Sequence, residues 1–162
     1  DRAPRVMSFD TADAWAGSYI AAIEQKHCSN LIANHQMLYL SQLVPNVRYD
    51  VFSAICRVSR RRNAELSLSG VLLFDGHRFC QLLDGPPASV ALVRQSIEKD
   101  PRHEFMTVLA DRPGDAATAP EPWQAGYCEA DDLDQLVGPE RLDEEQALAV
   151  FRAIVKRADL SP

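Results

Sequence analysis

Three neutral hydrogen-bonding side chains, Tyr39, Asn63 and Gln81, lie next to apolar runs in one part of this 162-residue sequence. A buried phenol or primary amide needs a hydrogen-bond partner, because an unpaired polar group is costly to remove from water. An amide such as Gln81 inside an apolar strand is therefore expected to have a specific partner. The chemistry that this set offers is hydrogen bonding, and it is the feature from which a function can be proposed.

Hydrophobic patterns predict the elements that position these residues. The run MLYLSQLV, residues 37–44, predicts a short apolar strand that contains Tyr39 and ends before Pro45. From Val51 onward the apolar residues follow helical spacing, so a helix is predicted to lead to Asn63.

A hairpin, a second helix and a further strand follow in the pattern. Two apolar runs flank Asp75 and Gly76, a pair that strongly indicates a hairpin, and Gln81 lies on the returning strand. Prolines at positions 86–87 open a helix, and residues 105–112 predict a strand. The order strand, helix, strand, strand, helix, strand predicts an α+β, ferredoxin-like (βαββαβ) sheet with two helices on one face.

Residues outside this core also show regular patterns. Apolar residues at four-residue spacing, from Trp15 to Ile23, predict an amphipathic N-terminal helix. WQAGY, residues 123–127, is expected to be a short edge strand. Residues 142–158 predict a helix capped by Asp143, and its apolar face must be buried on the sheet or on a second protomer. The predicted parts are an N-terminal helical extension (1–35), a central domain (36–128) and a C-terminal helical extension (129–162).

Composition and charge exclude several functional classes. The length allows one domain with a real core, and 46% hydrophobic with 25% charged residues is typical of a globular protein. A net charge of -6 disfavours nonspecific binding to nucleic acid or anionic lipid. No signal peptide is seen, and no apolar run approaches the roughly 20 residues that cross a bilayer. Neither the cysteines nor the histidines have metal-site spacing, so we expect free thiols, no metal and a cytoplasmic location.

Several strings of the sequence together resemble those of the BLUF family, blue-light sensors that use FAD. They are MLYLS, the spacing from Ser59 to Asn63, SGVLLFDGHRFCQLLDGP and DPRH, and they occur in the order of the predicted elements. The resemblance covers roughly residues 36–128 and implies a ferredoxin-like fold, FAD as cofactor and no catalytic activity. It also implies an output by conformational change, to an effector protein or through a homo-oligomer held by the helical extensions.

The resemblance implies roles for individual residues as well. Tyr39 would give an electron and a proton to the light-excited flavin. Gln81 would be the relay between Tyr39 and the flavin edge, because its amide has a donor end and an acceptor end. Asn63 would hold the carbonyl edge of the flavin. Other implied contacts with the cofactor are Ile55, Ser59, Arg62 and Ile97. Asp100, Arg102 and His103 would lie near its ribityl and phosphate part.

The last predicted strand departs from the family pattern. Trp123 and Gly126 match the motif that the resemblance links to signalling, but Ala125 stands where Met is usual and Pro120 where an aromatic residue is usual. An Ala at this position leaves a gap or admits Trp123 in place of the Met. We therefore expect flavin binding and photochemistry to persist and coupling to the last strand to be altered.

Simpler interpretations exist for each residue. Tyr39 could have its hydroxyl at the surface, Gln81 could face solvent, Asn63 could only end a helix, and Arg102 with Asp100 could be a surface ion pair. Two other classes of protein also stay open. A ferredoxin-like interaction module that has lost its flavin would be colourless when purified. An acyl-phosphate hydrolase would need an anion-binding loop, and no Gly-rich phosphate loop occurs in the sequence.

Overall fold

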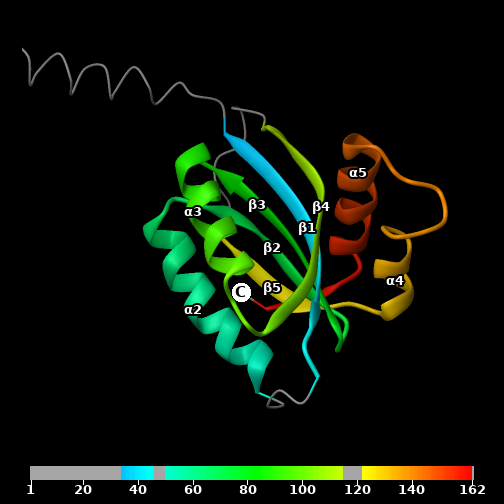
Figure 1. The fold of residues 1–162 in the computed structure, drawn as a ribbon, viewed down its shortest axis with the longest axis horizontal. Coiled ribbons are helices and arrows are strands. Elements are labelled where there is room, and N and C mark those ends of the chain that lie inside the picture. Colours follow the sequence, from blue (N-terminus) through cyan, green and yellow to red (C-terminus); the bar gives the residue numbers. More distant parts are fainter. Residues whose placement is uncertain (1–33, 46–49, 115–121, 162) are drawn as a thin grey trace, which may run out of the picture. The chain divides into compact units, whose positions relative to one another are not determined.

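A six-stranded sheet forms the centre of the computed structural model, which describes residues 34–45, 50–114 and 122–161 (Figure 1). The strands are β1 (His35–Leu43), β2 (Ser69–Phe74), β3 (Arg78–Gly85), β4 (His103–Pro113), β5 (Gln124–Tyr127) and β6 (Asp159–Ser161). Their order across the sheet is β4-β1-β3-β2-β5-β6, and the first four are joined by antiparallel pairs. The predicted ferredoxin-like α+β fold is confirmed.

Helices cover both faces of this sheet (Figure 1). The helices are α2 (Val51–Glu65), α3 (Pro87–Glu98), α4 (Ala130–Asp134) and α5 (Glu144–Val155). α2 and α3 lie on one face, while α4 and α5 lie on the other. Because successive side chains of a strand point to opposite faces, Tyr39 belongs to the α2–α3 core and its neighbours Leu38 and Leu40 belong to the α4–α5 core.

The C-terminal helix is capped and buried in the way that its sequence predicts. The Asp143 side chain accepts a hydrogen bond from the Gln146 backbone N–H at 2.8 Å, and the Gln146 side chain accepts one from the Asp143 N–H at 3.0 Å. This capping box fixes the start of α5. The helix then buries Leu148, Phe151 and Ile154 against the sheet, so this face is covered within the chain.

The end of the sheet differs from the prediction. WQAGY is not an edge strand, because β5 lies between β2, to which it is parallel, and β6. No sequence pattern predicts β6, since three residues are too few to show a period. Gly126 permits this pairing: a Cβ at that position would overlap the carbonyl oxygen of Asp159. The predicted N-terminal helix lies outside the described residues.

Candidate functional site

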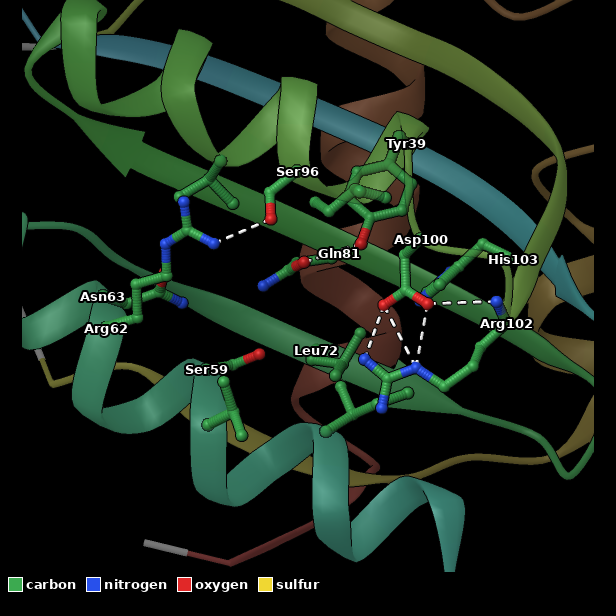
Figure 2. A pocket seen from close by; sticks show the side chains of 14 residues that line it. Tyr39, Ser59, Arg62, Asn63, Leu72, Gln81, Ser96, Asp100, Arg102 and His103 are labelled. Atoms are coloured by element: carbon green, nitrogen blue, oxygen red, sulfur yellow. Dashed lines mark hydrogen bonds and ion pairs between the residues drawn. The ribbon is translucent and has the colours of Figure 1, made fainter. Parts of the chain in front are cut away.

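A cavity of about 90 Å³ lies between α2, α3 and the sheet (Figure 2). All ten residues predicted to contact the cofactor line it, although they are spread over the chain from β1 to the start of β4. They are Tyr39, Ile55, Ser59, Arg62, Asn63, Gln81, Ile97, Asp100, Arg102 and His103. The fold therefore brings the whole predicted set together in one place.

A buried hydrogen bond joins the two residues predicted to be photochemical. The Tyr39 hydroxyl donates to Oε1 of Gln81 at 2.7 Å, and the two residues are register partners on β1 and β3. Only 1% of Tyr39 and 4% of Gln81 is exposed, so the interpretations that place these groups in solvent are wrong. Burial, with smaller contributions from Cys80 and Asp100, raises the pKa of the Tyr39 phenol far above its usual value. Tyr39 is therefore a neutral donor.

Asn63 provides a buried donor without a partner. It lies in the last turn of α2, is 2% exposed, and its Nδ2 has no hydrogen-bond partner among the described residues. A buried amide N–H that lacks an acceptor is costly and rare in folded proteins. Because Asn63 lines the cavity, a ligand with a carbonyl oxygen would satisfy this group. The carbonyl edge of a flavin ring fits this requirement.

An ion pair borders the same cavity close to solvent. The Asp100 carboxylate accepts hydrogen bonds from the Arg102 backbone N–H at 3.0 Å and from its guanidinium at 2.5–3.1 Å. These bonds lower the pKa of Asp100 and raise the pKa of Arg102. The Arg102 side chain is 40% exposed, so the pair is at the surface as the simpler interpretation predicts. It also lines the cavity, where a guanidinium suits an anionic oxygen.

His103 is held beside this ion pair by two strands. Its Nδ1 lies 2.9 Å from the Oγ of Ser41 on β1, and its ring centroid lies 4.8 Å from that of Phe79 on β3. Burial lowers the pKa of the imidazole, although the nearby Asp100 carboxylate opposes this effect. His103 is therefore expected to be neutral near neutral pH.

Four residues that were not predicted from the sequence also line the cavity: Val58, Leu72, Val93 and Ser96. Leu72 is the register partner of Gln81 because Phe74 lies opposite Phe79, whereas a two-residue Asp75–Gly76 loop would have paired Leu72 with Phe79. Helical spacing could have identified two of the others. Ser96 and Ile97 lie three and four residues after Val93, so the three side chains share one face of α3. Ser96 also accepts a 2.7 Å hydrogen bond from Arg62, which links α3 to α2 at the cavity (Figure 2).

The predicted signalling residues lie in the core next to the cavity. Trp123 and Ala125 are 4% and 3% exposed and belong to the same apolar cluster as Tyr39 and Leu72. The Trp123 Nε1 has no hydrogen-bond partner among the described residues. Ala125 also borders a groove between α2 and β5, of about 370 Å³, lined in part by Phe52. Space is therefore available beside Ala125, and the altered coupling expected from Ala in place of Met stays a prediction.

Three further features of the described residues concern their cysteines, metal ligands and membrane spans. In the described ranges Cys56, Cys80 and Cys128 are free thiols, of which only Cys80 is fully buried. Over the same ranges, no group of three or more His, Cys, Asp or Glu side chains has a metal-binding arrangement. None of the helices in the described part of the chain is long and apolar enough to cross a bilayer.

Comparison with known proteins gives the same family as the sequence motifs. Residues 35–120 match the profile of BLUF, described as sensors of blue-light using FAD. The chain is 36% identical over 88 residues to the photoactivated adenylate cyclase subunit beta of Euglena longa, which covers 54% of this chain and 10% of that protein. It is 32% identical over 76 residues to the blue light- and temperature-regulated antirepressor BluF of Escherichia coli, covering 46% of this chain and 19% of the relative.

A solved structure agrees over most of the domain. The dark-state structure of BlrB, a BLUF protein, superposes with a TM-score of 0.60 at 26% identity and covers 76% of this chain and 98% of BlrB. The curated relatives are far longer than the matched region, which is about a tenth of the cyclase. The shared part is a sensor domain that uses a flavin and is not itself catalytic. The chain belongs to the BLUF family of blue-light sensors.

Proposed function

We propose that this chain is a blue-light photoreceptor that binds FAD between α2 and α3 and signals through the Tyr39–Gln81 pair. The observation that supports it most is the buried Tyr39–Gln81 hydrogen bond in the wall of a cavity that also contains the unpaired Asn63 amide. These three groups line the same cavity, and none of them is charged. A neutral heterocycle with donor and acceptor edges matches these groups.

The residues that would hold FAD differ along the cavity. Asn63 would donate to a carbonyl of the ring, with Ser59 and Arg62 near the same ring. Ile55 and Ile97 would pack against the two ring faces from α2 and α3. The charged end, with Asp100, Arg102 and His103, would bind the ribityl and phosphate part. The choice of FAD over a smaller flavin rests on the family description.

The bound flavin would supply absorption of blue light and, once excited, a strong one-electron oxidant. Tyr39 cannot ionise first, because burial holds its pKa far above neutral pH. Its proton can therefore leave only with the electron or after it. Oε1 of Gln81, 2.7 Å from the Tyr39 hydroxyl, is the acceptor in line with that proton.

Gln81 would convert this transfer into a lasting change. An amide that takes a proton on Oε1 and releases one from Nε2, or that rotates, presents a different donor and acceptor pattern to the cavity. Tyr39 regains its electron and proton when the cycle closes, so no product is released. The new hydrogen-bond pattern would decay in the dark and would bias the conformation of the strands around it.

The signal is proposed to reach an effector protein or a second copy of the chain. Curated relatives are named as an adenylate cyclase and an antirepressor, which supports an effector as the recipient. The free thiols fit a reducing cytoplasm, where we place the protein.

The test is an absorption spectrum of the purified protein, with FAD added if needed, in the dark, after blue light and after dark recovery. We expect a reversible red shift of the flavin bands that is lost in Gln81→Ala and in Tyr39→Phe. Gln36→Ala is the matched control: Gln36 is also a buried amide on a central strand, but it bonds Asp84 and lies outside the cavity. A colourless protein, or bound flavin without a shift, would instead indicate a ferredoxin-like interaction module.

A further inference from the structure

Ser41 is a fully buried polar residue, two positions from Tyr39, to which neither the family motifs nor the cavity lining assigns a role. We propose that Ser41 is a positioning residue, whose hydroxyl donates to Nδ1 of His103 and holds the neutral imidazole with its proton on Nε2. The ring would then present an N–H donor to the cavity that it lines. What this donor binds rests on the flavin function proposed above.

An irregularity between two strands creates the contact. The register of β1 and β4 shifts between Leu40 and Gln42, and β4 contains an extra residue there. Phe105 lies in this bulge with a left-handed φ of 52°. Ser41 therefore has no Cα partner on β4, and its Oγ lies 2.9 Å from Nδ1 of His103 instead. Phe79 contacts the ring from β3, so residues of two other strands, β1 and β3, hold the imidazole.

Counting protons decides the direction of this hydrogen bond. Burial lowers the pKa of His103, with Asp100 opposing and Arg102 adding to the effect, so the ring has one N–H near neutral pH. If that proton were on Nδ1 and pointed to Ser41, the Ser41 O–H would have no acceptor among the described residues, in a fully buried position. If Ser41 donates to Nδ1, the donor left without a protein acceptor is Nε2–H, on a ring that lines the cavity. A ligand or water in the cavity can accept from that group, whereas an O–H trapped at the fully buried Ser41 has no such acceptor.

The Nε2–H group of His103 can donate a hydrogen bond to a ligand at the charged end of the cavity. The Arg102 guanidinium there is already engaged by Asp100 through several hydrogen bonds. A neutral Nε2–H adds a donor without adding a charge, which suits a hydroxyl or phosphate oxygen of the cofactor. The other tautomer would present a lone pair to the same oxygen and repel it. Ser41 thus acts on the ligand through His103 and not by contact.

The first test needs no flavin. In protein labelled with ¹⁵N-histidine, long-range ¹H–¹⁵N NMR spectra report which ring nitrogen is protonated, and His103→Gln assigns the signal. We expect an unprotonated Nδ1 in the wild type, a mixture of tautomers in Ser41→Ala, and recovery in Ser41→Thr, which restores the hydroxyl. Ser69→Ala is the control, since Ser69 bonds the Asp84 carbonyl on the far side of β3. A protonated Nδ1 in the wild type, or an unchanged tautomer in Ser41→Ala, would overturn the proposal.

The second test separates positioning from a general structural role. We expect the affinity for FAD to fall about tenfold in Ser41→Ala, as for loss of one well-formed hydrogen bond. It should fall similarly in His103→Gln and no further in the double variant, because Ser41 acts through the ring. Additive losses would overturn the proposal. A wild type with the Nε2–H tautomer but no affinity for FAD would support the role of Ser41 and contradict only the flavin function.

Discussion

The two faces of the sheet use the same strands for different purposes. On the α4–α5 face, Leu38, Leu73 and Cys80 pack against Phe151 and Ile154 in an apolar core. On the α2–α3 face, one residue further along the strands, Tyr39 and Gln81 bury polar groups beside a cavity. Strand alternation therefore lets one face supply stability and the other keep polar groups and empty space that packing alone would not favour.

The difference teaches where substitutions should have their effects. Truncation on the α4–α5 face removes packing and should change the free energy of unfolding. Substitution of polar groups around the cavity removes hydrogen bonds to a ligand and should change binding or photochemistry. The comparison fails if either face has the effects expected of the other.

The largest effect is expected from Phe151→Ala on the α4–α5 face. Phe151 is fully buried, so the free energy of unfolding should fall by about 3–5 kcal/mol in chemical denaturation. The light-induced shift of molecules that remain folded should be unchanged. Leu92→Ala is the control, because Leu92 is 51% exposed on α3 and its loss should cost less than about 0.5 kcal/mol. Loss of the shift in folded Phe151→Ala protein would break the comparison.

Asn63→Ala should lower the affinity for flavin and leave the stability of the folded protein nearly unchanged. The Nδ2 group has no partner to lose among the described residues, so the stability of the flavin-free protein should change little. Affinity for FAD should fall about tenfold, because a buried donor to the ring is removed. Equilibrium dialysis or fluorescence titration measures it, with Arg61→Ala on the exposed side of α2 as control. Unchanged affinity in Asn63→Ala would remove Asn63 from the site.

The pH dependence of stability should report His103 on the cavity face. Its pKa is lowered on folding, so the unfolded chain binds more protons below about pH 6.5. Stability of the flavin-free protein should then be full above that pH and decrease as the pH falls through the unfolded and then the folded pKa. Denaturation at a series of pH values should show a shallower slope in His103→Gln. An equal slope in both proteins would contradict a buried neutral imidazole.

Ala125→Met should act mainly on the response to light. The longer side chain can extend into the groove between α2 and β5, so the free energy of unfolding should fall by only about 1 kcal/mol, the low end for added volume at a buried site. Flavin binding and the dark spectrum should persist. The light-induced change in hydrogen exchange of β5 should differ from that of the wild type, because a Met there would place new contacts between β5 and α2. An unchanged response would count against altered coupling at Ala125.

Most of the elements and the set of candidate site residues were predictable from the sequence, for local reasons. Strand alternation around Tyr39, helical spacing before Asn63 and the Asp75–Gly76 turn depend on neighbouring residues. The family motifs then identified ten residues that the structure places around one cavity. Ser96 and Leu72 were missed because each resembles an ordinary helix or strand position until the opposite element is known. The interior position of β5 was missed because β6 is too short to leave a pattern.

The sequence by itself determined the period of each element, the turns and the residue types available to a flavin. Only the tertiary structure decided that the Asn63 amide is left unpaired, that α5 covers the second face, and that Ser41 meets His103 across a bulge. The physical reason is the range of the interactions. Propensity and periodicity act over a few neighbouring residues, whereas these contacts depend on strand register and on packing between segments far apart in the chain.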